Sequence, residues 1–192
     1  SQAKLLIKSK ETGKPEYKIL PLINGRGFNR LPKPAASGQD LFFDIEGLDK
    51  ILNPEETDND KSGLEYLFGI YYFENDKEKF KPLWAHNKKE EKKNIIEFFE
   101  FTKSHFKKYP SSKIYHYGSY EITALLKLTS LYNVKGIEYD HYLNLDKFVN
   151  LLNVNKQGLF ISENSYSLKN VEKFTLIFNI EKFLRLKNLL RY

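Results

Sequence analysis

The sequence DLFFDIEG at residues 40–47 decides the fold expected for this chain. Its apolar residues favour a buried strand, and Gly47 ends it. Because side chains alternate along a strand, Asp44 and Glu46 project from the same face, about 6–7 Å apart at the backbone. Two carboxylates this close repel each other unless a cation lies between them. The pattern indicates a site for hard divalent metal ions, and solvated surface charges are the alternative.

Composition limits the classes of function. The 192 residues contain no Cys, which excludes disulfide frameworks, thiolate zinc sites and cysteine nucleophiles. With 41% hydrophobic residues, one folded core is expected. The net charge of +6 is compatible with a nucleic-acid partner, although scattered lysines also form ordinary surfaces. No apolar run reaches the ~20 residues that span a bilayer, so a cytoplasmic protein without a membrane partner is expected. The lack of Met suggests a piece of a longer polypeptide.

The chain is expected to divide near residue 39. Residues 3–20 predict a hairpin, whose strands at 4–8 and 17–20 flank a turn-prone Thr-Gly-Lys-Pro. Prolines and glycines then interrupt regular structure. We therefore expect an N-terminal hairpin arm and linker over residues 1–39 and one domain over residues 40–192.

Hydrophobic patterns after residue 39 predict the elements of that domain. Apolar runs indicate strands, and stripes at helical spacing after capping residues indicate helices. The polar stretch 47–63 is expected to be a loop. The expected strands are 40–47, 64–73, 80–84, 113–117 and the apolar segment 148–154, and the expected helices are 87–108, 120–131, 165–174 and 174–190.

This order of elements is that of an α/β ribonuclease H-like fold, with a mixed five-stranded sheet, flanking helices and a central first strand that carries acids. The residues also resemble a family, the ribonuclease H-like domain of bacterial RecB-like nuclease and helicase proteins. That domain is related to the DEDD-type 3′–5′ exonucleases. The resemblance implies a metal-dependent nuclease and neighbouring nuclease or helicase domains as partners. The segments that carry it are 40–47 (DLFFDIEG), 63–70 (GLEYLFGI), 113–126 (KIYHYGSYEITALL), 165–174 (SYSLKNVEKF) and the leader 12–28 (TGKPEYKILPLINGRGF).

The resemblance implies three acidic site residues. Asp44 and Glu46 correspond to the first exonuclease motif, and Glu121 follows an aromatic residue where the relatives carry aspartate. Two Mg²⁺ or Mn²⁺ ions would activate water and stabilise the leaving oxygen of a phosphodiester in DNA or RNA. We predict that Asp44 bridges both ions, that Glu46 completes the shell of one and that Glu121 holds the other. A simple helix-capping role is the alternative for Glu121.

Four further residues are candidate nucleic-acid contacts. Aromatic rings stack on bases, and lysines contact phosphates. Core filling is the alternative for the tyrosines, and a solvated helix surface is the alternative for the lysine. The four residues are Tyr117, Tyr120, Tyr166 and Lys169.

The sequence departs from the resembled pattern in three places. The fourth carboxylate often comes from Tyr-x-x-x-Asp on the last helix, and no such pattern stands near the end of the sequence; either Tyr192 is its tyrosine and the aspartate lies beyond it, or the acid is lost. Asn150 stands where related domains often have aspartate, and Leu48 follows Gly47 where an acidic residue is expected. These departures favour an alternative function, an inactive ribonuclease H-like module that binds nucleic acid or docks neighbouring domains. A glycosidase with two carboxylates is a weaker alternative, because Asp44 and Glu46 share one strand and do not flank a sugar.

Overall fold

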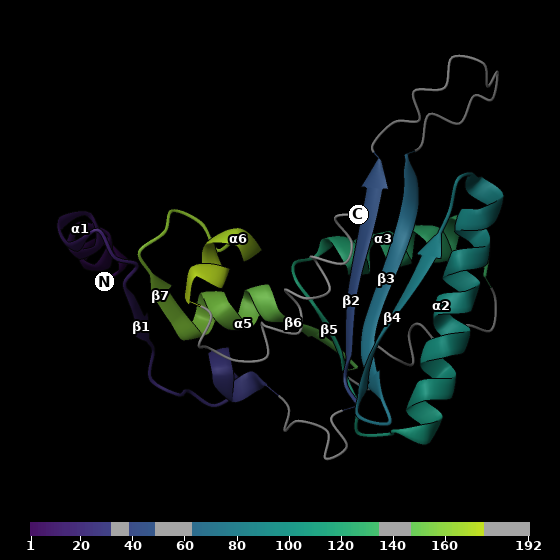
Figure 1. The fold of residues 1–192 in the computed structure, drawn as a ribbon, viewed down its shortest axis with the longest axis horizontal. Coiled ribbons are helices and arrows are strands. Elements are labelled where there is room, and N and C mark those ends of the chain that lie inside the picture. The colour runs from purple at the N-terminus through teal and green to yellow at the C-terminus, as the bar shows by residue number, and fades with distance from the viewer. Residues whose placement is uncertain (32–38, 49–62, 135–146, 175–192) are drawn as a thin grey trace.

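The computed structural model describes residues 1–31, 39–48, 63–134 and 147–174. In Figure 1 the five-stranded sheet with α2 and α3 lies at one end of the molecule, and α1, β1, β7, α5 and α6 gather at the other. None of the helices in these ranges is both long and apolar enough to cross a membrane. The predicted helix over 174–190 and most of the predicted loop over 47–63 lie outside the described residues.

The larger sheet has the strand order β4-β3-β2-β5-β6. The central strand β2 (Leu41–Leu48) pairs antiparallel with β3 (Leu64–Glu74), which pairs antiparallel with β4 (Lys77–Trp84). On its other side β2 pairs in parallel with β5 (Ile114–His116), and β5 pairs in parallel with β6 (Phe148–Asn150). This is the mixed five-stranded sheet that the sequence predicted.

Local sequence explains the meander of β2, β3 and β4. Asn75 and Asp76 have φ angles of 51° and 60°, which are the left-handed values of a tight hairpin turn between β3 and β4. Pro82 lies within β4, which is an edge strand of the sheet. Proline has no N–H to donate, and an edge strand tolerates this because it pairs on one side only. Phe43 of β2 is fully buried, as its predicted central position requires.

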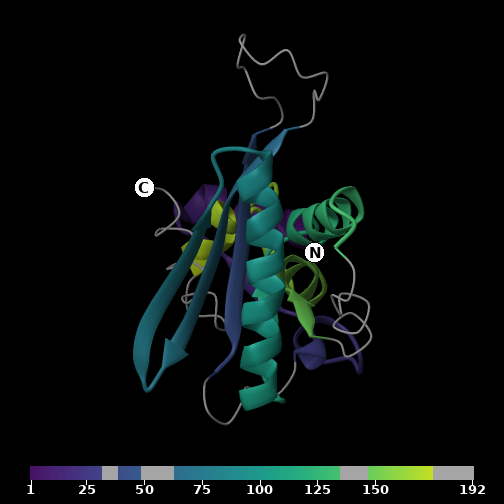
Figure 2. The same ribbon diagram turned by 90° about the vertical axis from the view of Figure 1, so that its right-hand side faces the viewer.

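Two helices cover one face of this sheet. α2 (Lys88–Lys108) begins after Asn87, whose side chain accepts a 3.0 Å hydrogen bond from the N–H of Glu90. Figure 2 shows α2 running along the sheet, and α3 (Tyr120–Leu131) packs beside it. Their apolar stripes meet alternate residues of β2. This first core includes Leu41, Phe43, Ile45, Phe98, Ile114 and Leu125.

The opposite face of the sheet holds a second core. It receives Phe42 from β2 and Tyr115 from β5, whose rings stack with centroids 5.4 Å apart. Leu151, the first residue of α5 (Leu151–Gly158), packs against it. The segment 148–154, expected as a strand, is therefore a strand only as far as Asn150, whose side chain caps the helix that follows. Each strand therefore sends alternate side chains to different cores, and this alternation fixes which face carries each candidate site residue.

The N-terminal segment corrects the predicted hairpin. Residues 4–8 belong to a helix, α1 (Gln2–Thr12), which ends at Gly13 with a left-handed φ of 66°. β1 (Tyr17–Ile19) forms where a strand was predicted, but it pairs antiparallel with β7 (Leu159–Ile161). The sequence KLLIK suits a helix as well as a strand, and the true partner of β1 lies far along the chain.

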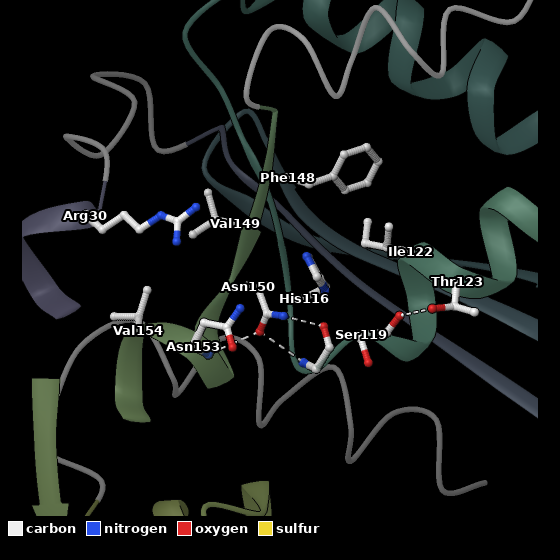
Figure 3. Close-up of a pocket in the computed structure, with 11 residues that line it drawn as sticks. Arg30, His116, Ser119, Ile122, Thr123, Phe148, Val149, Asn150, Asn153 and Val154 are labelled. Atoms are coloured by element: carbon white, nitrogen blue, oxygen red, sulfur yellow. Dashed lines mark hydrogen bonds between the residues drawn. The ribbon is translucent and has the colours of Figure 1, made fainter. Parts of the chain in front are cut away.

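The leader docks on α5 through a close backbone approach. The N–H of Gly27, at the start of the 3₁₀ helix η1 (Gly27–Arg30), donates a 3.2 Å hydrogen bond to Gln157 Oε1. A Cβ on Gly158 would lie 2.9 Å from the ring of Phe28, so glycine is needed there. This contact holds Arg30 beside the end of β6 (Figure 3).

The last described elements are short. α6 (Leu168–Val171) continues into the 3₁₀ helix η2 (Glu172–Phe174). The side chain of Ser167 accepts a 3.4 Å hydrogen bond from the N–H of Asn170, so the helix expected over 165–174 begins three residues later than predicted.

Candidate functional site

Asp44 lies in the middle of the central strand and Glu46 near its end, on the face that Phe42 shares with the second core. The strand runs on to Leu48, one residue past the Gly47 at which it was expected to end. The Asp44 side chain is buried, with 2% of the residue exposed, and Glu46 is half-buried. Asp44 is opposite Gly69 and Glu46 is opposite Leu67 on β3. A buried carboxylate is costly unless hydrogen bonds or a cation stabilise its charge. The predicted pairing of these two acids on one face is therefore present.

Glu121 approaches the sheet from the other face. It occupies the first turn of α3 and is 3% exposed. It lies on the same face of α3 as Leu125, one turn later, which belongs to the first core. Its Oε2 atom lies 3.6 Å from Nδ1 of His116, and neither atom makes a hydrogen bond with a described group. His116 follows Ile114 by two residues and so shares its face of the sheet.

The structure therefore brings Asp44 and Glu46 together and places Glu121 against His116. Within the described ranges, no group of three or more His, Cys, Asp or Glu side chains is arranged to hold a metal ion. The roles of Asp44, Glu46 and Glu121 as metal ligands stay a prediction.

The candidate tyrosines are tied to the protein by their hydroxyls. Tyr117 donates a 2.6 Å hydrogen bond to the carbonyl of Tyr166, and burial raises the Tyr117 pKa to about 12. Tyr166 donates at 2.8 Å to the carbonyl of Leu159, and burial raises its pKa as well. Tyr120 keeps 46% of its surface exposed, and Lys169 is exposed on α6. Tyr120 and Lys169 are thus the more accessible of the four.

A buried acidic pair beside Gly47 escaped the sequence reasoning. Glu65 and Glu91 are 5% and 0% exposed, and the N–H of Glu65 donates a 2.6 Å hydrogen bond to Glu91 Oε1. The hydroxyl of Tyr120 donates a 2.7 Å hydrogen bond to Glu65 Oε2. A Cβ on Gly47 would collide with both the Glu65 carboxylate and the Tyr120 hydroxyl. Gly47 therefore permits this contact between β2, β3 and α3.

Two lysines and a second tyrosine contact the carboxylates of Glu65 and Glu91. Lys127 Nζ lies 3.5 Å from Glu65 Oε1, and Lys88 Nζ lies 3.3 Å from Glu91 Oε2. Tyr132 donates a further hydrogen bond to Glu91. One signal in the sequence could have found Glu65, because it is an acid inside an otherwise apolar strand.

The comparison with protein families decides the classification. A family model described as RNase H superfamily matches residues 41–184, which is most of the chain and begins at the first residue of β2. The chain belongs to the RNase H superfamily. A search of curated proteins and a search of solved structures gave no match. Membership of the RNase H superfamily supports a nuclease-type activity and nucleic-acid binding, and the leader before residue 41 lies outside the matched range.

RNase H-like nucleases generally use divalent metal ions. Carboxylate oxygens are the ligands that Mg²⁺ prefers. Asp44 and Glu46 offer such oxygens on one face, and the burial of Asp44 is the kind of cost that a bound cation offsets. These two residues fit as metal ligands. Glu121 fits in chemistry, since its Oε2 accepts no hydrogen bond from any described group, although it lies against His116.

Asn150 has a structural role in this RNase H-like domain. Its Oδ1 accepts hydrogen bonds from the N–H groups of Gly118 (3.3 Å) and Leu152 (3.0 Å), and its Nδ2 donates at 2.7 Å to the Gly118 carbonyl. Gly118 has a φ of 113°, which a side chain would strain. An ionised aspartate lacks the donor for the Gly118 carbonyl, so the amide suits this turn.

A pocket of about 290 Å³ opens where β5 and β6 end (Figure 3). Its lining combines polar and apolar side chains from η1, β5, α3, β6 and α5. Among the described residues that line it there is no Asp or Glu. The lining residues include Arg30, His116, Ser119, Ile122, Phe148 and Asn153.

Proposed function

We propose that this RNase H-like domain is a metal-dependent nuclease that hydrolyses phosphodiester bonds of DNA or RNA, with the 3′–5′ exonuclease polarity of the family that it resembles. The observation that carries the proposal is the buried carboxylate of Asp44 beside Glu46 on one face of the central strand. Membership of the RNase H superfamily supports the reaction class. The domain would act within a larger RecB-like nuclease or helicase protein.

The proposed chemistry uses the acids as metal ligands and positioning groups. Mg²⁺ or Mn²⁺ ions, when bound, lower the pKa of an attacking water and stabilise the leaving oxygen. Asp44 and Glu46 would hold the ions. Glu121 lies against His116 on the other face of the sheet, so it is not assigned to the same ions. Asp44 is buried and its backbone pairs with Gly69 of β3, so its position is set before a substrate phosphate binds.

Two exposed side chains would contact the nucleic acid. The ring of Tyr120 is 46% exposed while its hydroxyl is held by Glu65, so the ring is presented in a fixed orientation. An oriented ring is suited to stacking on a base. Lys169 is exposed and would contact a phosphate.

The first test is cleavage of 5′-labelled single- and double-stranded DNA and RNA oligonucleotides in Mg²⁺ or Mn²⁺. We expect Asp44→Asn to lower the rate at least about a hundredfold, because it removes a metal-binding charge with little change in shape. Glu100→Gln is the matched control, since Glu100 is an exposed acid on α2. Equal cleavage by the Asp44→Asn variant and the wild type would reject the assignment.

Polarity needs its own substrates. A 3′–5′ exonuclease should shorten a 5′-labelled strand one nucleotide at a time, and a 3′-terminal phosphorothioate should slow it. Internal cuts of equal intensity along the strand would instead indicate an endonuclease and would overturn the proposed polarity.

A second candidate is a non-catalytic module that binds nucleic acid. Two observations favour it: the amide of Asn150 is engaged by the Gly118 turn, and Glu121 packs against His116. This function predicts salt-dependent oligonucleotide binding that is equal in wild type and Asp44→Asn, without cleavage by either. Binding that Asp44→Asn weakens only when Mg²⁺ is present would favour the nuclease.

A further inference from the structure

The pocket at the ends of β5 and β6 has the chemistry of an anion site with an apolar wall. Arg30 lines it and forms no ion pair with a described carboxylate. In Figure 3 the Arg30 side chain reaches toward Val149 on β6. A guanidinium with no neighbouring acid is available to a phosphate, for which its planar donors are well suited.

A buried side chain points to a ligand independently of Arg30. His116 is 2% exposed, lines the same pocket, and lies between Asn150 and Ile122 in Figure 3. Its Nδ1 lies 3.6 Å from Glu121 Oε2 and makes no hydrogen bond with a described group. A buried polar ring without a hydrogen-bond partner is costly, and because the ring of His116 lines the pocket, a ligand there is positioned to contact it.

The rim of the pocket adds donors that the fold does not use. Ser119 caps α3, but its side chain makes no capping hydrogen bond, so the first turn of this 12-residue helix keeps N–H groups that no capping side chain satisfies. Asn153 is exposed at the start of α5, and none of its side-chain atoms bonds to a described residue. The Asn150 amide fixes the Gly118 turn below them, so the rim is held in place before a ligand arrives.

The apolar side of the pocket argues against a bare inorganic anion. Phe148 and Ile122 line it, and Phe148 is half-buried with its ring on the first-core side of β6. A volume of about 290 Å³ is at the lower end for ligand pockets and is too large for a phosphate alone. Aromatic and aliphatic walls beside cationic donors match a base or sugar that carries a phosphate.

We propose that this pocket binds one phosphate-bearing nucleotide unit, with Arg30 on its phosphate and with Phe148 and Ile122 against its base or sugar. The assignment rests on the proposed function, because the nucleotide is taken to belong to the strand that the domain cleaves or to its mononucleotide product. Arg30 lies in the leader, outside the residues that match the RNase H superfamily model.

The experiment measures ligand binding to the metal-free chain in EDTA, by chemical shifts of the Gly118 and Ser119 amides. The ligands are deoxyadenosine 5′-monophosphate, deoxyadenosine and inorganic phosphate. We expect the mononucleotide to bind with a dissociation constant of about 1 mM or tighter, and both other ligands to bind at least about fivefold more weakly. Equal binding of nucleoside and nucleotide, or of phosphate and nucleotide, would overturn the assignment.

Variants locate the site. Arg30→Gln should weaken mononucleotide binding about tenfold, and Asn153→Asp should weaken it by placing an anion at the rim. Arg26→Gln is the matched control, because Arg26 is an exposed arginine of the same leader that does not line this pocket. Equal affinity of the Arg30→Gln and Arg26→Gln variants would place the nucleotide elsewhere.

Asp44→Asn separates this inference from the proposed function. It should keep the mononucleotide affinity in EDTA, since Asp44 does not line the pocket. Loss of cleavage with retained binding in this variant supports both proposals. Binding by a wild type that cleaves no oligonucleotide supports the pocket alone and rejects the nuclease. Cleavage of oligonucleotides without mononucleotide binding rejects the proposed nucleotide pocket and leaves the nuclease proposal standing.

Discussion

The hydroxyl of Tyr120 donates a 2.7 Å hydrogen bond to the Glu65 carboxylate directly above Gly47. Tyr120 precedes Glu121 in α3, and Gly47 follows Glu46 in β2. This contact therefore joins the first turn of α3 to β3, and it packs against Gly47, the residue after Glu46 in the central strand. The two sequence motifs that suggested a nuclease are linked through a residue, Glu65, that belongs to neither.

Removing the Tyr120 hydroxyl tests this link. Tyr120→Phe deprives a buried carboxylate of a donor, so the free energy of unfolding should fall by about 1–3 kcal/mol. Urea unfolding at neutral pH measures the change. Tyr17→Phe is the control, because Tyr17 is 45% exposed and should change stability little. Equal stabilities of the two variants would mean that the Tyr120–Glu65 bond contributes nothing net.

Gly47 can be tested by adding one methyl group. Gly47→Ala places a Cβ against the Glu65 carboxylate and the Tyr120 hydroxyl, so either the contact or the end of β2 must shift. We expect a loss of more than about 2 kcal/mol in the free energy of unfolding, as overpacking of a fixed site typically costs. Gly25→Ala provides the comparison, since Gly25 has a φ of 71° but open space around it, and its cost is backbone strain of about 1 kcal/mol. A smaller loss at Gly47 than at Gly25 would contradict the steric argument.

Asn150 provides a test of the departure from the aspartate expected in related domains. Asn150→Asp keeps the acceptor for the N–H of Leu152 but loses the donor to the Gly118 carbonyl and sets a negative charge against it. Stability should fall by about 1–3 kcal/mol in thermal or urea unfolding. Asn150→Ser, which also keeps a capping oxygen without the charge, should lose less. An Asn150→Asp variant as stable as the wild type would show that the amide is not needed.

The sheet and its covering helices were predictable because their signals are local. α3 spans the predicted residues 120–131, and α2 spans Lys88–Lys108 where a helix over 87–108 was predicted. The leader was not predictable in the same way, because the KLLIK run suits a helix or a strand and β1 finds its partner in β7. Pairing between distant strands depends on tertiary packing, which no local pattern records.

In the candidate site, too, the local features were predictable and those that depend on tertiary packing were not. Alternation on one strand correctly placed Asp44 and Glu46 on one face. Glu121 was expected beside them, but which face its side chain meets depends on how α3 packs, and it meets His116. Glu91 was missed because it lies in a run of charged residues that reads as a solvated helix face, although it is fully buried.

The buried His105 makes stability depend on pH. Its Nε2 donates a 2.7 Å hydrogen bond to the Gln39 carbonyl. Desolvation lowers its pKa below the ordinary 6.5; the Gln39 hydrogen bond and the charge of Asp40 oppose this shift, and Lys108 and Lys147 add to it. The unfolded chain then binds more protons than the folded chain below pH 6.5. The stability contributed by neutral His105 is therefore complete above this pH and is lost as the pH falls through the lowered pKa.

Urea unfolding at several pH values should show a decline on acidification that is smaller in His105→Gln, whose amide can still donate to Gln39. His86→Gln is the matched control at an exposed histidine, and it should keep the full decline of the wild type. If His105→Gln loses as much stability on acidification as His86→Gln, another group controls the pH dependence.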